Sequence, residues 1–291
     1  MTTPTTLFNP SRLDARRVPE RSPRGDGESG ARAELVDPVV GEHVITVTSP
    51  RSFEADQYRI LRHFLAQSDL PARKVLGVTS PAAGDGKTTT AVNLAITLAQ
   101  SAGARVLLID ADLRRPFVGT SLGLDEQGEP GLAATALDPT LELSQIVTTT
   151  PFNLDVVLAG PSTPNAYRLF DSPRVGKLLE EARSQYDHIV LDTPPILLVP
   201  DCRLMSQWVD GFLVVVSAHR TPRRLAADAV GAIDQDKVLG VVFNGDDRPL
   251  AGYFSRYQGY YGYHERASAK RGRPWRMPWN RDARKSTSSW W

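Results

Sequence analysis

Cysteine is nearly absent from this sequence, since position 202 holds the one cysteine among 291 residues. A lone thiol excludes an intramolecular disulfide framework and a cysteine-based metal site, and it is typical of a reducing compartment. Long apolar runs are also missing, because no stretch reaches the roughly 18 residues that a membrane-spanning helix needs. The first residues, rich in Thr, Pro and Arg, lack the apolar segment of a signal peptide. We therefore expect a soluble, cytoplasmic globular protein.

A large net charge is absent as well, but the charges are unevenly distributed around the total of +1. Residues 1–40 carry six basic and six acidic side chains, residues 41–263 carry 20 and 25, and residues 264–291 carry eight and two. The acidic body and the absence of a recognition motif argue against a nucleic-acid partner. The basic end predicts either a contact with anionic lipid or an acidic protein, or a solvated tail.

Short β-branched runs alternate with longer segments of helical spacing. The runs that predict strands are 44–47, 75–79, 106–109, 155–158, 189–191, 212–216 and 238–243. The segments that predict helices are 54–67, 87–101, 173–185, 201–208 and 222–234. Continuous apolar strands separated by helices indicate an α/β fold, with a doubly wound, mostly parallel sheet and helices on both faces.

This alternation is confined to the middle of the chain, so we expect one domain over residues 41–250. Residues 1–40 have no sustained apolar period and cannot bury enough surface to offset the entropy of ordering, which predicts disorder. A tyrosine cluster follows the domain at 251–264. Residues 265–291 are basic, contain four Trp and are also predicted to be disordered.

The segment 79–89, TSPAAGDGKTT, joins a predicted strand to a predicted helix. Glycines let backbone N–H groups converge on phosphate oxygens, and the N-terminus of the next helix favours the same negative charge. Lys87 can reach the β- and γ-phosphates, and the Thr88 hydroxyl can ligate Mg²⁺. Pro81 stands where the pattern usually has its first glycine. The alternative, a glycine-rich turn without a ligand, fits the intact Gly-Lys-Thr poorly. The residues expected to bind the nucleotide phosphates are Ala83, Gly84, Asp85, Gly86, Lys87, Thr88 and Thr89.

Two predicted strands end in acidic residues. The run VLLIDAD places Asp110 and Asp112 at the end of one strand, and HIVLD places Asp192 at the end of another. The carboxyl ends of strands in an open parallel sheet are where ligands bind, so these carboxylates should meet the phosphate loop. Mg²⁺ bound to phosphate takes such oxygen ligands, directly or through water. For each aspartate taken singly, a helix cap or turn is the alternative.

These motifs together resemble the bacterial tyrosine kinases (BY-kinases) of capsule and exopolysaccharide synthesis, which belong to the deviant Walker P-loop ATPases. The resemblance rests on the phosphate loop, LLIDADLRRP, LDTPP and GPSTPN, and it runs from about Val44 to Asn244. It implies ATP and Mg²⁺ as cofactors, and an adenine-reading role for Asn244. It also implies catalytic roles for Lys87, Asp110 and Asp112. The implied Mg²⁺ ligands are Thr88, Asp110 and Asp192.

The resemblance further implies an oligomerisation helix with an acid-x-x-Arg-x-x-Arg pattern. Asp56, Arg59 and Arg62 fit it, and their spacing places them along one side of a helix, suited to ion pairs between subunits. The alternative is an ordinary solvated charged face.

Three positions depart from related patterns. Ala83 replaces a proline typical of the kinase loop, and Arg168 stands where the kinases usually have Glu. Ala82 stands where partitioning ATPases carry a second lysine, so its presence favours the kinase branch.

Five of the eight tyrosines lie within eleven residues, with Gly, Ser and Gln between them. That spacing matches neither a helix nor a strand, so packing does not explain the cluster. The family resemblance implies that these tyrosines are autophosphorylation sites, and the alternative is a low-complexity tract that binds a partner. The expected phosphoacceptors are Tyr253, Tyr257, Tyr260, Tyr261 and Tyr263.

We therefore expect an ATP-dependent protein-tyrosine autokinase that modifies its tail in trans within a homo-oligomer and regulates polysaccharide polymerisation and export. The resemblance implies a membrane chain-length-regulator adaptor that recruits it to the inner face of the membrane, and a tyrosine phosphatase as a further partner. The alternatives are a partitioning or positioning ATPase and a nucleotide-dependent scaffold without kinase activity.

Overall fold

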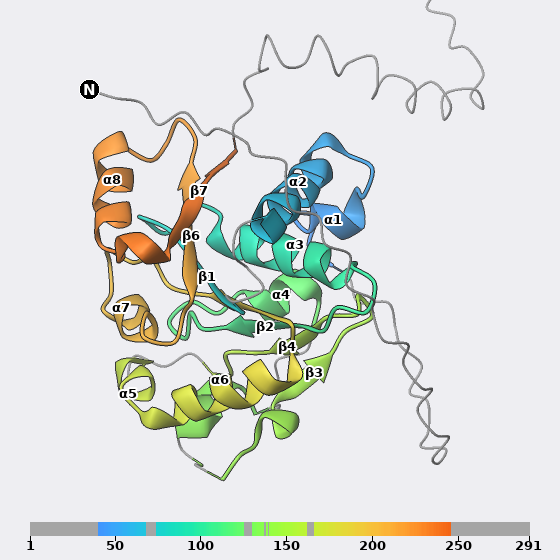
Figure 1. Ribbon diagram of the computed structural model, residues 1–291, viewed down its shortest axis with the longest axis vertical. Coiled ribbons are helices and arrows are strands. Elements are labelled where there is room, and N and C mark those ends of the chain that lie inside the picture. The colour runs from blue at the N-terminus through green and yellow to red at the C-terminus, as the bar shows by residue number, and fades with distance from the viewer. Residues whose placement is uncertain are drawn as a thin grey trace, which may run out of the picture. The chain divides into compact units, whose positions relative to one another are not determined.

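A seven-stranded sheet lies at the centre of the part of the chain that the computed structural model describes, residues 40–67, 74–124, 130–136, 138, 140–161 and 166–245 (Figure 1). The strands are β1 (Val75–Thr79), β2 (Val106–Asp110), β3 (Val147–Thr149), β4 (Asp155–Val157), β5 (His188–Asp192), β6 (Gly211–Ser217) and β7 (Val238–Asn244). Their spatial order is β3-β4-β2-β5-β1-β6-β7. All neighbours pair in parallel except β3 and β4. The doubly wound, mostly parallel fold predicted from the sequence is confirmed.

The helices within the described residues occupy both faces of this sheet. They are α1 (Ile45–Thr48), α2 (Phe53–Gln67), α3 (Lys87–Ala99), α4 (Val118–Leu122), α5 (Ala166–Phe170), α6 (Pro173–Gln185), α7 (Asp201–Met205) and α8 (Arg223–Gly231). Short 3-10 helices lie at Leu132–Ala136, Leu143–Gln145 and Gln235–Lys237. The predicted N-terminal segment, except residue 40, and the tyrosine cluster and basic tail lie outside the described residues.

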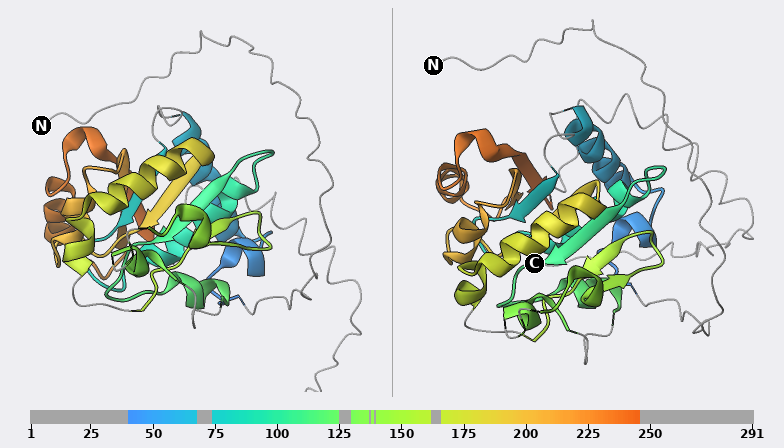
Figure 2. Two further views of the ribbon diagram at one scale, coloured as in Figure 1. Left: turned by 90° about the horizontal axis from the view of Figure 1, so that it is seen from below. Right: turned by 60° about the horizontal axis from the view of Figure 1, so that its bottom comes forward.

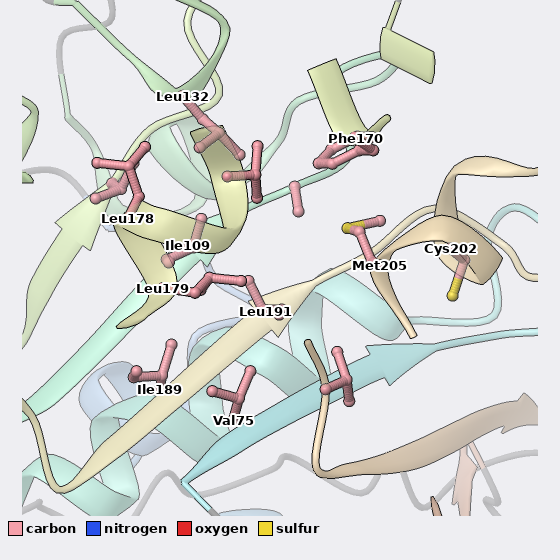
Figure 3. Packing of buried hydrophobic residues seen from close by; sticks show 14 of the residues in the cluster. Val75, Ile109, Leu132, Phe170, Leu178, Leu179, Ile189, Leu191, Cys202 and Met205 are labelled. Atoms are coloured by element: carbon pink, nitrogen blue, oxygen red, sulfur yellow. The ribbon is translucent and has the colours of Figure 1, made fainter. Parts of the chain in front are cut away.

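Each face of the sheet has its own apolar core. Figure 2 shows the helices and the sheet between which these cores lie from two further directions. On the α3 side, every residue of α3 except Thr89 is buried, which explains why this helix is apolar around most of its circumference. On the other side, Phe170, Leu179 and Met205 gather over Ile109 and Leu191 (Figure 3). The residual cavity there is only about 10 Å³, room for about one water molecule. This cavity is therefore too small for a nucleotide.

The predicted strand at 44–47 is wrong. These residues form α1 and the turn before it, and they pair with no strand. The reason is a buried polar anchor that the β-branched pattern does not reveal. Asn93 Oδ1 on α3 accepts hydrogen bonds from Thr46 N at 3.0 Å and Thr46 Oγ1 at 2.9 Å. Thr48 Oγ1 also donates to the carbonyl of Val44, four residues earlier, at 3.2 Å.

Other differences concern short elements. The sequence pattern missed β3, which has three residues and pairs antiparallel with β4 at an edge of the sheet. It also missed the five-residue helices α4 and α5, which are too short to show a period. The predicted helices 201–208 and 222–234 are shorter here, as α7 and α8. None of the helices in the described ranges has the length and apolar character needed to cross a bilayer.

The topology brings the predicted acidic residues to one edge of the sheet. Asp110 and Asp192 are paired in register at the carboxyl ends of β2 and β5. Thr79 ends the neighbouring strand β1 and leads into the loop before α3. This is the edge at which ligands bind in open α/β sheets.

Candidate active site

The loop between β1 and α3 has the backbone conformation of a phosphate cradle. Gly84 and Gly86 have φ angles of 85° and 94°, which residues with a side chain rarely adopt. A Cβ on Gly86 would lie 1.8 Å from Nδ2 of Asn244, so only glycine fits there. Around Gly84 no atom lies within 4 Å of the corresponding position, so a ligand can approach the backbone closely. The first N–H groups of α3 lie at the same end and favour an anion.

Asp85 holds this loop in place through both of its carboxylate oxygens. Oδ2 accepts a hydrogen bond from Ala82 N at 3.0 Å, and Oδ1 accepts one from Thr221 Oγ1 at 2.6 Å. The backbone carbonyl of Asp85 accepts a further bond from Asn244 Nδ2 at 3.1 Å. The buried carboxylate of Asp85 therefore fixes the conformation of the loop, even though the loop contains two glycines.

Lys87 lies between two carboxylates. Its Nζ is 2.7 Å from Asp112 Oδ2 and 3.7 Å from Asp192 Oδ1. Thr88 Oγ1 donates a hydrogen bond of 2.7 Å to Asp192 Oδ2. All four residues are buried, so salt screens their interactions much less than it screens exposed charges.

In this cluster, Lys87 and the neighbouring carboxylates stabilise the charged forms of one another. Burial alone lowers the pKa of Lys87, but Asp192 and Asp112 together raise it more, so the ammonium group stays charged. Burial raises the pKa of Asp192 to about 6, although Lys87 and the Thr88 hydroxyl act in the opposite direction. An additional cation beside Asp192 would therefore be stabilising.

The donors around Asp192 fit Mg²⁺ that arrives with a nucleotide. Asp192 Oδ1 is buried and accepts no hydrogen bond from the described residues. In these residues no group of three or more His, Cys, Asp or Glu side chains could hold a metal ion by itself. Mg²⁺ usually binds through one or two carboxylates, waters and substrate phosphates. One unsatisfied carboxylate oxygen beside the Thr88 hydroxyl suits that mode of binding.

Asp110 has a different environment from the other two aspartates. Its Oδ2 accepts hydrogen bonds from the N–H groups of Phe117 and Val118, both at 3.0 Å, and Oδ1 accepts one from Asp112 N at 3.1 Å. Burial and the neighbouring Asp192 raise the pKa of Asp110 to about 8, against the effect of these N–H donors. Asp110 therefore caps the N-terminus of α4, although it lies seven residues before Phe117 in the sequence. Its predicted roles, as a ligand of Mg²⁺ and as an acceptor of the tyrosine proton, would use its remaining lone pairs.

An open groove of about 520 Å³ lies over this cluster. The phosphate loop and the start of α3 form one part of its lining, and the segments that follow β2 and β5 form the rest. The lining residues are Ala83, Gly84, Gly86, Lys87, Thr88, Thr89, Asp112, Arg114, Arg115, Phe117, Pro194, Pro195, Leu198 and Val199. The groove thus contains most of the predicted phosphate-binding residues together with one predicted catalytic carboxylate.

Sequence reasoning missed several residues that shape this groove. Arg114 Nε and Nη2 donate to the carboxylate of Asp201 at 2.7 and 3.1 Å, which ties the segment after β2 to α7. Thr221 anchors Asp85, and Phe117 and Leu198 supply apolar surface. Arg114 belongs to the LLIDADLRRP motif. The other three residues have no local signal, because they reach the site through the tertiary fold.

The other predicted site residues lie apart from the groove or beyond the described residues. Asn244, at the end of β7, contacts the phosphate loop through Asp85. On α2, Arg59 bonds to Asp56 and to the carbonyl of Pro50, whereas Arg62 bonds to the carbonyl of Thr97 on α3 and to Ser101. These three side chains therefore all make contacts within one chain, while the Arg59 side chain remains 38% exposed. The five predicted phosphoacceptor tyrosines lie outside the described residues.

The chain is similar in sequence to known proteins. Residues 73–219 match a family model described as an AAA domain. The chain is 38% identical over 224 residues to the tyrosine-protein kinase YwqD of Bacillus subtilis, covering 76% of this chain and 91% of that protein. It is 32% identical over 231 residues to the succinoglycan biosynthesis transport protein ExoP of Rhizobium meliloti, covering 76% of this chain but 29% of that longer protein.

A solved structure supports the same assignment. The kinase domain of the Escherichia coli tyrosine kinase ETK superposes with a TM-score of 0.64 at 27% identity, covering 71% of this chain and 82% of that domain. The sequence matches and the shared fold thus agree, and the chain belongs to the bacterial tyrosine-kinase family of P-loop proteins.

Proposed function

We propose that this kinase uses Mg²⁺-ATP to phosphorylate the tyrosine cluster 251–264 of a neighbouring copy of the same chain. The observation that carries the proposal is the position of Lys87, buried between Asp112 and Asp192 at the opening of a preorganised phosphate loop. Five acceptor tyrosines follow β7 in the sequence. They are Tyr253, Tyr257, Tyr260, Tyr261 and Tyr263.

The residues of the loop divide the work of holding the nucleotide. Backbone N–H groups from Ala83 to Thr89 would bind the phosphates, and Lys87 would neutralise charge on the transferring group. Thr88 and Asp192 would hold Mg²⁺, with Asp110 as a further ligand through water. Asn244 would read the adenine from the side of β7. Bound ATP would supply the phosphoryl group, and Mg²⁺ would neutralise part of the negative charge on the phosphates.

The transfer forms a bond between the tyrosine oxygen and the γ-phosphorus, and it breaks the bond from that phosphorus to the β,γ-bridging oxygen, which leaves with ADP. The tyrosine proton passes to a carboxylate and then to solvent. We assign this role to Asp112, because Asp112 lines the groove and Asp110 does not. A phenol with a pKa of about 10 is a weak nucleophile, so positioning provides much of the catalysis.

Transfer between chains requires an assembly, for which we propose a homo-oligomer that uses Asp56, Arg59 and Arg62 of α2. We also propose a membrane adaptor of the chain-length-regulator class, a tyrosine phosphatase that reverses the modification, and a role in polysaccharide polymerisation and export. The similarity to ExoP, named for succinoglycan biosynthesis transport, supports the last of these. Each phosphate would add about −1.5 to −2 charges to a basic tail.

The experiment that tests the activity compares the wild-type chain with Lys87→Met after incubation with Mg²⁺-ATP, with phosphotyrosine mapped by mass spectrometry. The wild type should carry phosphate on the tyrosine cluster, and Lys87→Met should carry almost none. Lys177→Met is the matched control, because Lys177 is exposed on α6 and does not line the groove. Full labelling of a folded Lys87→Met chain would contradict the proposal. Steady ATP hydrolysis without phosphotyrosine in the wild type would favour a positioning ATPase instead.

A further inference from the structure

Two large apolar side chains are exposed at the nucleotide groove, where solvent contact is unfavourable unless a ligand covers them. Phe117 is 44% exposed and Leu198 is 61% exposed, and both line the groove. They come from separate segments, one after β2 and one after β5. Single exposed apolar residues are common on protein surfaces, but two that line one functional groove indicate a binding surface.

The position of Phe117 is fixed by contacts of its backbone and of one face of its ring. Its backbone N–H donates to Asp110 Oδ2 at 3.0 Å. Its ring stacks on the ring of His43, with centroids 5.6 Å apart and planes inclined by 20°. His43 Nε2 is in turn 2.9 Å from Ser121 Oγ of α4. One face of the ring is thus covered by the protein, while the ring remains partly open at the groove.

The segment that carries Leu198 is also anchored to the phosphate site. Ile196 N donates to the carbonyl of Ser80 at 3.0 Å, and Thr193 N donates to the carbonyl of Val78 at 3.0 Å. Leu198 N closes a turn on the carbonyl of Pro195 at 3.2 Å. The backbone carrying this apolar group is therefore fixed relative to the phosphate loop.

The groove combines these apolar side chains with a charged cluster. Asp112 and Lys87, 2.7 Å apart, line the same groove as Phe117 and Leu198. A ligand that matches this arrangement has a flat apolar body and one hydroxyl, which describes a tyrosine side chain. Phe117 follows β2, whereas Asn244 ends β7 at an edge of the sheet, with β5, β1 and β6 between these strands. This separation favours the acceptor over the adenine as the partner of Phe117.

We propose that Phe117 and Leu198 form the binding surface for the phenol ring of the acceptor tyrosine, supplied by residues 251–264 of a second copy of this chain. This inference rests on the proposed kinase function and assigns the acceptor subsite of that groove. The ring packs on Phe117 and Leu198, and the hydroxyl points toward Asp112. Aromatic contacts of this kind contribute affinity for the acceptor and leave nucleotide binding unchanged.

The test uses a full chain in which the five cluster tyrosines are Phe, so that no internal acceptor competes. A fluorescent peptide with the sequence of residues 251–264 is titrated against the ADP-bound enzyme, and its phosphorylation is measured separately with ATP. Phe117→Ala and Leu198→Ala should each weaken peptide binding and raise the peptide KM roughly three- to tenfold. The affinity for ADP should change less than about twofold, and Phe117→Trp should retain most of the peptide affinity.

Phe243→Ala is the control, because Phe243 is 68% exposed on β7 and does not line the groove; it should leave peptide binding unchanged. The proposal is overturned if the parent does not bind the peptide or if neither groove variant alters that binding. It is also overturned if Phe117→Ala weakens ADP binding as much as peptide binding, because the ring would then contact the nucleotide. Peptide binding that depends on Phe117 without phosphate transfer would instead refute the kinase function and leave the acceptor surface supported.

Discussion

At the scale of single residues, the phosphate loop depends on glycine for two separate reasons. Gly86 has a positive φ, and Asn244 Nδ2 occupies the space that a side chain would need. Gly103 also has a positive φ, of 74°, but no atom lies within 4 Å of the place of its Cβ. The two positions therefore separate the cost of backbone strain from the cost of a steric clash.

We predict that Gly86→Ala abolishes nucleotide binding, whereas Gly103→Ala leaves it intact. Both variants should lose about 1 kcal/mol of unfolding free energy through backbone strain, and Gly86→Ala should lose more because Asn244 must move. Calorimetric titration with ADP and urea unfolding measure the two effects. Equal nucleotide affinity in both variants would show that the loop tolerates displacement of Asn244.

The sequence revealed the residues of the site better than their individual roles. The Gly-Lys-Thr motif is local, so the positions of Lys87 and Thr88 at the start of α3 follow from the chain itself. The division of work among the three aspartates does not. Asp112 pairs with Lys87 and Asp110 binds the backbone at the start of α4, and both outcomes depend on a crossover from β2 that sequence spacing does not specify.

At the scale of elements, a half-buried ion pair joins α6 to the start of β1 and β6. Asp210 accepts hydrogen bonds from Arg183 Nη1 and Nη2 at 2.7 and 2.8 Å, and from Val75 N at 2.8 Å. Burial raises the pKa of Asp210, but the bonds from Arg183 and Val75 lower it more, so the net shift is downward. The ionised form therefore stabilises the fold at neutral pH.

We predict that Asp210→Asn lowers the unfolding free energy by about 2 kcal/mol at pH 7. Because the folded-state pKa is depressed, this stabilisation is present above the ordinary aspartate pKa and is lost as the pH falls through the folded value. The difference between wild type and variant should therefore shrink below about pH 4. Urea unfolding at both pH values measures it, with the exposed Asp236→Asn as control. A difference independent of pH would contradict the role of the charge.

Helix α2 is the element on which the proposed assembly depends. We predict that Arg59→Ala combined with Arg62→Ala lowers the mass of the oligomer measured by light scattering. The same change should cost the monomer about 1 kcal/mol, because Arg62 bonds to Thr97 and Ser101 within the chain. Arg223→Ala with Arg224→Ala, exposed on α8, is the control. An unchanged oligomer mass would contradict the prediction, because the two arginines would then act only through their contacts within one chain.

Most elements were predictable because the sheet is parallel and covered on both faces. Strands such as β1 and β2 are buried along their whole length, and that burial produces the continuous apolar runs seen in the sequence. The same rule failed at 44–47, where β-branched residues form α1. The deciding contact there is the hydrogen bond between Thr46 and Asn93, which lie 47 residues apart. A local sequence pattern cannot reveal a contact over that separation.

At the scale of the whole molecule, the described residues contain the proposed nucleotide site, and the sequence places the proposed substrate tyrosines after the last strand. A short connection runs from Asn244 to Tyr253. In-line transfer requires the acceptor oxygen, the phosphorus and the leaving oxygen to align. A neighbouring chain can deliver its tyrosines to the groove without the constraint of that connection, which is the physical reason for proposing transfer in trans.

The most direct test mixes two inactive chains, Lys87→Met and the variant with all five cluster tyrosines replaced by Phe, and adds Mg²⁺-ATP. Intact-mass spectrometry distinguishes the chains and counts the phosphates on each. The account predicts that phosphate appears in the mixture alone and on the Lys87→Met chains alone, because one chain supplies the active site and the other the acceptors. An assembled mixture with no phosphate on the Lys87→Met chains, or with phosphate on Tyr58, Tyr167 or Tyr186 in place of the cluster, would contradict it.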